Sequence, residues 1–156
     1  MLLTSISLHD LRSSLQAALA TGKAGEIVNV RLHWQLPLSD AAPTTSPISL
    51  LTALLQAVDL CDVALKLGPT TWRIRLSSNA RLVHAMGVDD RGRTLIVSIA
   101  DDSDSLAQLT VFGNHGVIRL DHAELSLDGL TPDIAERGWS SSLIAAFNAY
   151  SKPVTG

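Results

Sequence analysis

Three regions of the chain repeat their apolar residues at the three- to four-residue period of a helix. The first begins near Ser7 and ends at Gly22, the second spans residues 48–67, and the third starts at Thr131-Pro132. Their apolar stripes contain Leu8, Leu11, Leu15 and Leu19; Leu51, Leu54, Leu55, Val58, Cys61 and Leu65; and Trp139, Leu143, Ile144, Phe147 and Tyr150. The pattern therefore predicts three amphipathic helices.

Between these regions the apolar period changes to two, which is typical of strands with one buried face. The first such stretch places Val28, Val30, Leu32, Trp34 and Leu36 on the predicted buried side. Further strands are expected at residues 71–77, 81–88, 93–100, 106–112 and 117–121, with turns between them. The order of elements predicts one α+β domain over residues 1–156, with a mainly antiparallel open sheet of about six strands and helices packed on one face.

The other face of this sheet is expected to stay uncovered by helices. It mixes arginine and histidine with large apolar side chains, so a plain solvent-facing surface does not explain it. We expect an isologous homodimer that buries this face. The residues assigned to it are Arg31, His33, Gln35, Arg73, Arg75, Ile96, Thr110, Phe112, Val117 and Arg119. A protein partner or a small ligand that the sequence does not identify is also expected.

Composition and charge exclude several classes of protein. Apolar residues make up 46% of the chain and charged residues 17%, which is an ordinary globular balance. A net charge of −3 without a basic stripe argues against nucleic acid as a partner. The single cysteine, Cys61, allows no disulfide framework and is expected to be a buried, inert thiol. No signal peptide or membrane span is apparent, so a cytoplasmic protein without membrane contact is expected.

Every candidate catalytic or metal-binding group has an ordinary structural interpretation. Paired aspartates beside strands favour turns, the histidines lack the spacing of metal ligands, and the serine run lacks the strand–turn–helix setting of a nucleophile. These groups are Asp89-Asp90, Asp101-Asp102, His115 with Asp121 and His122, and Ser140-Ser141-Ser142. We therefore expect no catalytic, cofactor-binding or metal-binding residue, and no cofactor.

Four segments follow one another in the order of a known domain. They are LRSSLQAALATGKAGEIVNVRLHWQ, QAVDLCDVALKLGPTTWRI, LTVFGNHGVIRLDHAELSLDG and SSLIAAFNAYSKPVTG. In turn they resemble a helix with a Gly-x-x-Gly turn and a strand, a helix ending in Leu-x-Gly, a Gly-x-x-Gly hairpin, and a helix leading to a basic-Pro tail. The set resembles the C-terminal, sheet-forming domain of the Gfo/Idh/MocA oxidoreductases, which include glucose-fructose oxidoreductase and inositol dehydrogenase.

The chain departs from this family where the family carries its chemistry. The resemblance implies a separate dinucleotide-binding half, whose Gly-rich turn follows a strand; here Gly22-Lys23-Ala24-Gly25 follows a predicted helix. The resemblance also places a proton-transfer His on the helix matching residues 48–67. Gln56, or Val58 in another register, stands there, and neither exchanges a proton near neutral pH. Gln56 and Asp59 are expected on a solvated helix face.

The C-terminal Ser151-Lys152-Pro153 resembles the family's Glu-Lys-Pro motif, but it follows a helix and is assigned no catalytic role. The leading hypothesis is a stand-alone, non-catalytic, pseudoenzyme-like binding or accessory protein. One alternative is the substrate-domain subunit of a split NAD(P)-dependent oxidoreductase. Another is a small α+β lyase or isomerase with an unrelated pocket. The sequence favours a protein without enzymatic activity but leaves these alternatives open.

Overall fold

The alternating and helical stretches of the sequence become the following elements. The helices are α1 (Leu8–Ala20), α2 (Pro47–Leu65) and α3 (Ser140–Ser151), and the long strands are β2 (Ile27–Leu36), β3 (Thr70–Leu76), β4 (Leu82–Asp89), β5 (Thr94–Asp101), β6 (Leu106–Gly113) and β7 (Val117–His122). Two short strands, β1 (Ile6–Ser7) and β8 (Leu125–Ser126), pair with each other in parallel. These elements come from a computed structural model that describes residues 6–37, 47–77, 81–122, 125–126 and 138–151.

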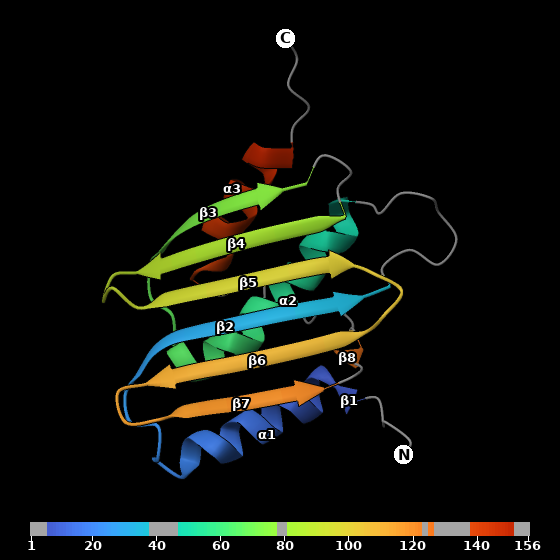
Figure 1. The fold of residues 1–156 in the computed structure, drawn as a ribbon. Coiled ribbons are helices and arrows are strands. Elements are labelled where there is room, and N and C mark those ends of the chain that lie inside the picture. Colours follow the sequence, from blue (N-terminus) through green and yellow to red (C-terminus); the bar gives the residue numbers. More distant parts are fainter. Residues whose placement is uncertain (1–5, 38–46, 78–80, 123–124, 127–137, 152–156) are drawn as a thin grey trace.

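The six long strands form one sheet in the order β3-β4-β5-β2-β6-β7 (Figure 1). Neighbouring strands are antiparallel except β2 and β5, which are parallel. The predicted α+β class and six-stranded sheet are confirmed, and the sheet is mixed. The parallel pair arises because α2 carries the chain from β2 to the far edge, and three consecutive strands then return beside β2.

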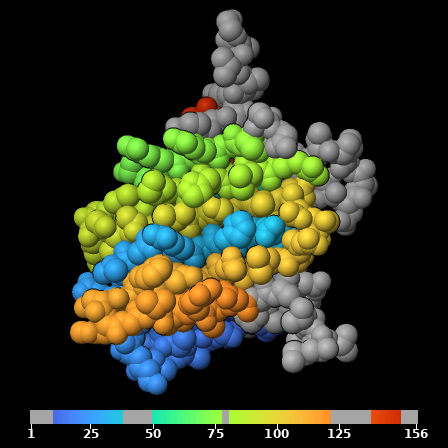
Figure 2. Space-filling view, viewed as in Figure 1, coloured from blue at the N-terminus to red at the C-terminus, as the bar shows by residue number. Residues whose placement is uncertain are grey.

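The helices lie on one face of the sheet, as predicted. α2 packs over β2 and β5, with α1 on one side of it and α3 over β3 on the other (Figure 1). The strand residues beneath them are fully or almost fully buried, including Trp34, Val97 and Leu109. We call the opposite side the open face; Figure 2 looks onto it and shows side chains of the six strands with no helix over them.

The predicted buried side of β2 is wrong at its first residue. Val28 is 45% exposed, and Ile27 is buried in its place. The pairing of β2 with β6 shifts between Ile27 and Asn29, which marks a β-bulge. A bulge adds one residue to a strand and so reverses the inside–outside alternation before it. From Val30 to Leu36 the predicted alternation is confirmed.

Two Gly-x-x-Gly turns that lie far apart in the sequence interlock at one end of the sheet. The Asn114 side chain accepts a hydrogen bond from the Glu26 backbone N–H (2.8 Å), and the His115 N–H donates to the Ala24 carbonyl (2.9 Å). Gly25 has a φ of +74°, and a Cβ there would overlap the Asn114 and His115 side chains. Glycine is therefore required for both the backbone conformation and the close contact.

Candidate functional site

The position on α2 at which the family resemblance places a proton-transfer His is buried in this chain. Gln56 and Asp59 are 4% and 6% exposed, so the prediction of a solvated helix face is wrong for both. The physical reason is that α2 contacts the sheet, α1 and α3, and all residues from Ala53 to Cys61 are buried. A helix that is apolar nearly all round is typical of such a setting, and this signal was present in the sequence.

Asp59 is held by an ion pair with Arg12 of α1. The Arg12 guanidinium donates to Asp59 Oδ2, and the two side chains are 33% and 8% exposed. The pair therefore reaches from the helix layer toward solvent on the arginine side. Sequence analysis missed Arg12, because nothing local links residues that lie 47 positions apart.

The chemistry available at this position is binding and orientation. A guanidinium–carboxylate pair can orient polar groups through charge-assisted hydrogen bonds. Gln56 offers an amide, and the fully buried Val58 offers only apolar contact. Neither residue can exchange a proton near neutral pH. The related motif at Lys152-Pro153 lies outside the described residues.

The turn between α1 and β2 does not have the geometry of a dinucleotide-binding turn. The turn from Thr21 to Glu26 runs from α1 into β2, so it leads from a helix to a strand. A phosphate-binding turn runs from a strand into the positive N-terminus of a helix. No step of chemistry on a nucleotide can be assigned to this turn.

The first pair of adjacent aspartates is structural, as predicted. Asp89 Oδ1 accepts the backbone N–H groups of Arg91 and Arg93, and Asp89 Oδ2 pairs with the Arg93 guanidinium (2.7 Å). Burial on its own raises the pKa of Asp89, but hydrogen bonds from Arg93 and Arg91 outweigh it and lower this pKa below its usual value. Arg93 also donates to the Lys66 carbonyl, which joins the β4–β5 turn to the end of α2. Asp89 therefore stabilises a turn.

The second pair lies where β5 ends, with Asp101 as the last residue of the strand and Asp102 as the first residue of the turn to β6. Asp101 pairs with Arg81 (3.6 Å), and Asp102 accepts the Asp104 backbone N–H (3.0 Å) and the Gln35 side chain (3.2 Å). In the part of the chain that the structure describes, no three or more His, Cys, Asp and Glu side chains are grouped to hold a metal ion. His115 lies in the β6–β7 turn, and Asp121 lies near the other end of β7.

Of the remaining candidates, Cys61, the tryptophans and Ser140 are buried, whereas Ser141 and Ser142 are exposed. Cys61 is fully buried, and burial raises the pKa of its thiol far above the ordinary value, with Asp62 adding to the effect. The predicted burial of Cys61 is confirmed. Trp34 and Trp139 are buried as predicted, and Trp72 is buried as well. Ser140 is buried at the start of α3. No described strand leads directly into this helix, so the strand–turn–helix setting of a serine nucleophile is not seen among the described residues.

Among the described helices, none is both long and apolar enough to cross a membrane.

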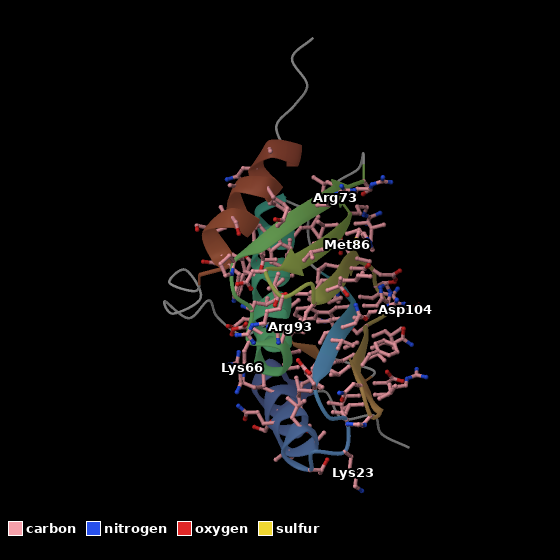
Figure 3. The ribbon with its side chains drawn as sticks, turned by 90° about the vertical axis from the view of Figure 1, so that its left-hand side faces the viewer. Lys23, Lys66, Arg73, Met86, Arg93 and Asp104 are labelled. Atoms are coloured by element: carbon pink, nitrogen blue, oxygen red, sulfur yellow. The ribbon has the colours of Figure 1, made fainter. Side chains whose placement is uncertain are left out.

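All ten residues assigned to the uncovered side of the sheet lie on the open face. The register pairs Arg31 with Ile96 and Thr110, and pairs His33 with Ser98 and Gln108. Figure 3 shows Arg73 and Met86 on the side away from the helices, and Lys66 and Arg93 on the helix side. Their role as a dimer contact stays a prediction.

Comparison with known proteins gives structural likeness only. No protein-family profile matches the chain, and no curated protein matches its sequence. Among solved structures, the myo-inositol dehydrogenase from Lactobacillus casei, in complex with NAD(H) and myo-inositol, is 18% identical with a TM-score of 0.58. The match covers 93% of this chain and 50% of that one.

Two further dehydrogenases give the same result. A myo-inositol dehydrogenase from Corynebacterium glutamicum is 12% identical, with a TM-score of 0.52 over 88% of this chain and 50% of that chain. Levoglucosan dehydrogenase, in complex with NADH and levoglucosan, is 14% identical, with a TM-score of 0.55 over 73% and 39%. The chain thus spans about half the length of the inositol dehydrogenases that it matches. It has the fold of the sheet-forming domain of Gfo/Idh/MocA-type dehydrogenases, as its four sequence segments imply.

Proposed function

We propose that this chain is the substrate-side domain of an NAD(P)-dependent oxidoreductase. In this proposal the nucleotide-binding half is supplied from outside these 156 residues. The observation that carries the proposal is the match of 93% of this chain to half of a dehydrogenase that binds NAD(H) and myo-inositol. A polyol or sugar is the substrate class that these neighbours indicate.

In this proposal the described residues bind and orient, and the partner domain transfers the proton and holds the nucleotide. Gln56 and Val58 leave the α2 position without an acid or base. The Arg12–Asp59 pair is the polar group that α1 and α2 place together, with its arginine reaching solvent. It is suited to orient the companion domain or a hydroxyl-rich ligand, since guanidinium and carboxylate groups form strong hydrogen bonds.

The test is to recover the tagged full chain from its native cells and to assay the eluate. NAD and NADP are supplied with myo-inositol, levoglucosan or L-sorbose, and reduced nucleotide is followed by absorbance. We expect polyol-dependent reduction that co-elutes with the chain and is absent from a mock purification. A chain that elutes without a nucleotide-binding companion and without such activity contradicts the proposal.

A second candidate function is a non-catalytic binding protein on the same fold. It is favoured by the absence of a proton-transfer side chain at Gln56 and Val58 and by the engagement of Asp59 with Arg12. This function predicts that myo-inositol or another polyol binds the purified chain in calorimetry, while the native-cell eluate stays inactive with both nucleotides.

A further inference from the structure

Two histidines flank one serine near the middle of the open face. The strand register pairs Ser98 of β5 with His84 of β4 on one side and with His33 of β2 on the other. His84 Nδ1 lies 2.8 Å from Ser98 Oγ, so these two side chains share a hydrogen bond. His84 is exposed and His33 is partly exposed. At about 4.8 Å between strands, the two imidazoles start from backbone positions roughly 10 Å apart.

The charged groups nearest to these histidines in the register are arginines. Arg75 of β3 pairs directly with His84, and Arg73 lies two residues along the same strand. On β2, Arg31 precedes His33 by two residues and therefore lies on the same face. Arg73 and Arg75 have no charged partner among the described residues. A proton added to either imidazole therefore enters a cationic environment.

The carboxylates on this side of the sheet are bound to other groups. Asp121 of β7 accepts a hydrogen bond from Arg119 (3.2 Å), and β6, which lies between β7 and β2, contains no charged residue. Asp102, in the turn after β5, accepts the Gln35 side chain (3.2 Å) and the Asp104 backbone N–H (3.0 Å). Figure 3 shows Asp104 on the side away from the helices. None of these carboxylates lies beside a histidine in the register, so none directly offsets a charged imidazole.

The open face also has apolar area that a second copy would cover. Met86 and Ile96 pair with each other next to the histidines, and both are partly exposed. Val88 and Val117 are 40% and 56% exposed. Six strands at about 4.8 Å, each with four outward residues at roughly 7 Å, span on the order of 700 Å². This approaches the roughly 800 Å² that each copy contributes to a standard interface, and Figure 2 shows the strands as one continuous surface.

The isologous dimer expected from the sequence would place two such faces in contact. Arginine is common in protein interfaces, where apolar burial and retained water accommodate it. Protonation of His33 and His84 in both copies would add four positive charges to this contact, and like charges oppose association. Water excluded from the contact would screen these charges less than bulk solvent does. Histidine is the side chain whose charge changes between about pH 5 and 8.

We propose that His33 and His84 make the association of two copies through the open face dependent on pH. The dimer holds while both histidines are neutral, and it separates when they bind protons. Because the separated chain binds more protons than the dimer, the dissociation constant rises as pH falls. The proposal rests on the predicted homodimer. It is independent of the proposed oxidoreductase role, which belongs to the helix side of the sheet.

A metal ion is a poorer explanation for this pair of imidazoles. A structural zinc site takes four ligands. In the part of the chain that the structure describes, no three or more His, Cys, Asp and Glu side chains are grouped to hold a metal ion. The neighbouring arginines would also repel a cation. The pair is therefore better suited to carry a charge that changes with pH.

The experiment measures the dissociation constant of the full chain by sedimentation velocity at pH 8 and at pH 5.5, at constant ionic strength. These values span most of the range in which histidine changes its charge. The test variant combines His33→Gln with His84→Gln, which keeps polar side chains without a titrating group. The control is His115→Gln, which removes an exposed histidine from the β6–β7 turn, outside the strand positions of the face.

For the wild type and the control, we expect the dissociation constant to rise at least about tenfold between pH 8 and pH 5.5, because four imidazoles of the dimer contribute. For the test variant, we expect a rise of less than about threefold. Circular dichroism is expected to show a folded chain at both pH values. Ile96→Asp with Phe112→Asp is expected to give a folded monomer at pH 8. If that variant does not fold, Val117→Asp replaces it, at a position that is 56% exposed.

Four outcomes overturn the proposal. The first is a wild type that is monomeric at tens of micromolar at pH 8, and the second is a wild-type dimer with the same dissociation constant at both pH values. The third is a test variant that keeps the full response to pH. The fourth is a folded open-face aspartate variant that stays dimeric, because the contact then lies elsewhere. None of these outcomes bears on the proposed oxidoreductase role, which is tested with nucleotide and polyol.

Discussion

The two faces of the six-stranded sheet are built from alternate residues of the same strands, yet they differ in burial and in charge. On the covered face, Trp34, Leu32 and Val30 are buried under the helices. On the open face, the adjacent Arg31 and His33 retain contact with solvent. The covered face therefore determines the fold through apolar burial, and the open face contributes little to the core of the single chain.

The largest expected effect is on the covered face. Trp34→Ala removes a fully buried indole, and we expect the free energy of unfolding to fall by about 3–5 kcal/mol. The matched change on the open face, His33→Ala, is expected to cost about 0.5 kcal/mol or less, as surface substitutions usually do. Urea unfolding of both variants makes the measurement. Equal losses would show that the two faces do not differ in their contribution to stability.

A second change tests the interlocked turns that join α1 and β2 to the β6–β7 hairpin. Gly25→Ala adds a Cβ that would overlap Asn114 and His115 at a positive φ, and about 2–4 kcal/mol of destabilisation is expected. Gly22→Ala has a similar φ of +71° but meets no atom within 4 Å, so about 1 kcal/mol is expected. Denaturant midpoints of the pair separate contact from backbone strain. Equal costs would rule out a tight interlock.

A third change concerns the turn that anchors β4 and β5 to α2. Asp89 has a lowered pKa in the folded state, so its stabilising effect is complete above the pKa of about 4 in the unfolded chain and is lost as pH falls through the folded value. Asp89→Asn is expected to cost about 1–3 kcal/mol at pH 7. The difference from wild type should shrink below pH 4 in a pH series of thermal melts. A difference that grows on acidification would contradict the assigned direction.

The smallest expected effect returns to the open face. Arg73→Thr with Arg75→Thr removes two exposed side chains without described ion-pair partners, so the free energy of unfolding should change by about 0.5 kcal/mol or less. Urea denaturation checks this value. A loss comparable to that of Trp34→Ala would mean that this face stabilises the fold of the single chain.

Local periodicity was sufficient to predict most of the fold. Each long strand lies within one or two residues of its predicted position, because apolar alternation and turn residues are local signals. Val28 was misplaced because a bulge depends on pairing with β6, which its own sequence does not reveal. The parallel pairing of β2 with β5 likewise depends on the path of α2 across the sheet.

The candidate site was less predictable than the fold. Gln56 and Asp59 are polar, which suggested solvent, but their neighbours from Ala53 to Cys61 indicate a helix that is covered on several sides. The partner of Asp59 is Arg12 on another helix, and such pairing is set by tertiary packing. The open-face residues were placed correctly because strand alternation fixes the side on which each residue lies.

The most direct test of a substrate-side domain without its own nucleotide site is calorimetric titration of NADH into the purified full chain. The chain has a helix-to-strand turn where a nucleotide site needs a strand-to-helix turn, so no heat of binding is expected up to millimolar NADH. Saturable binding with micromolar affinity would contradict the assignment and would place a nucleotide site within these 156 residues.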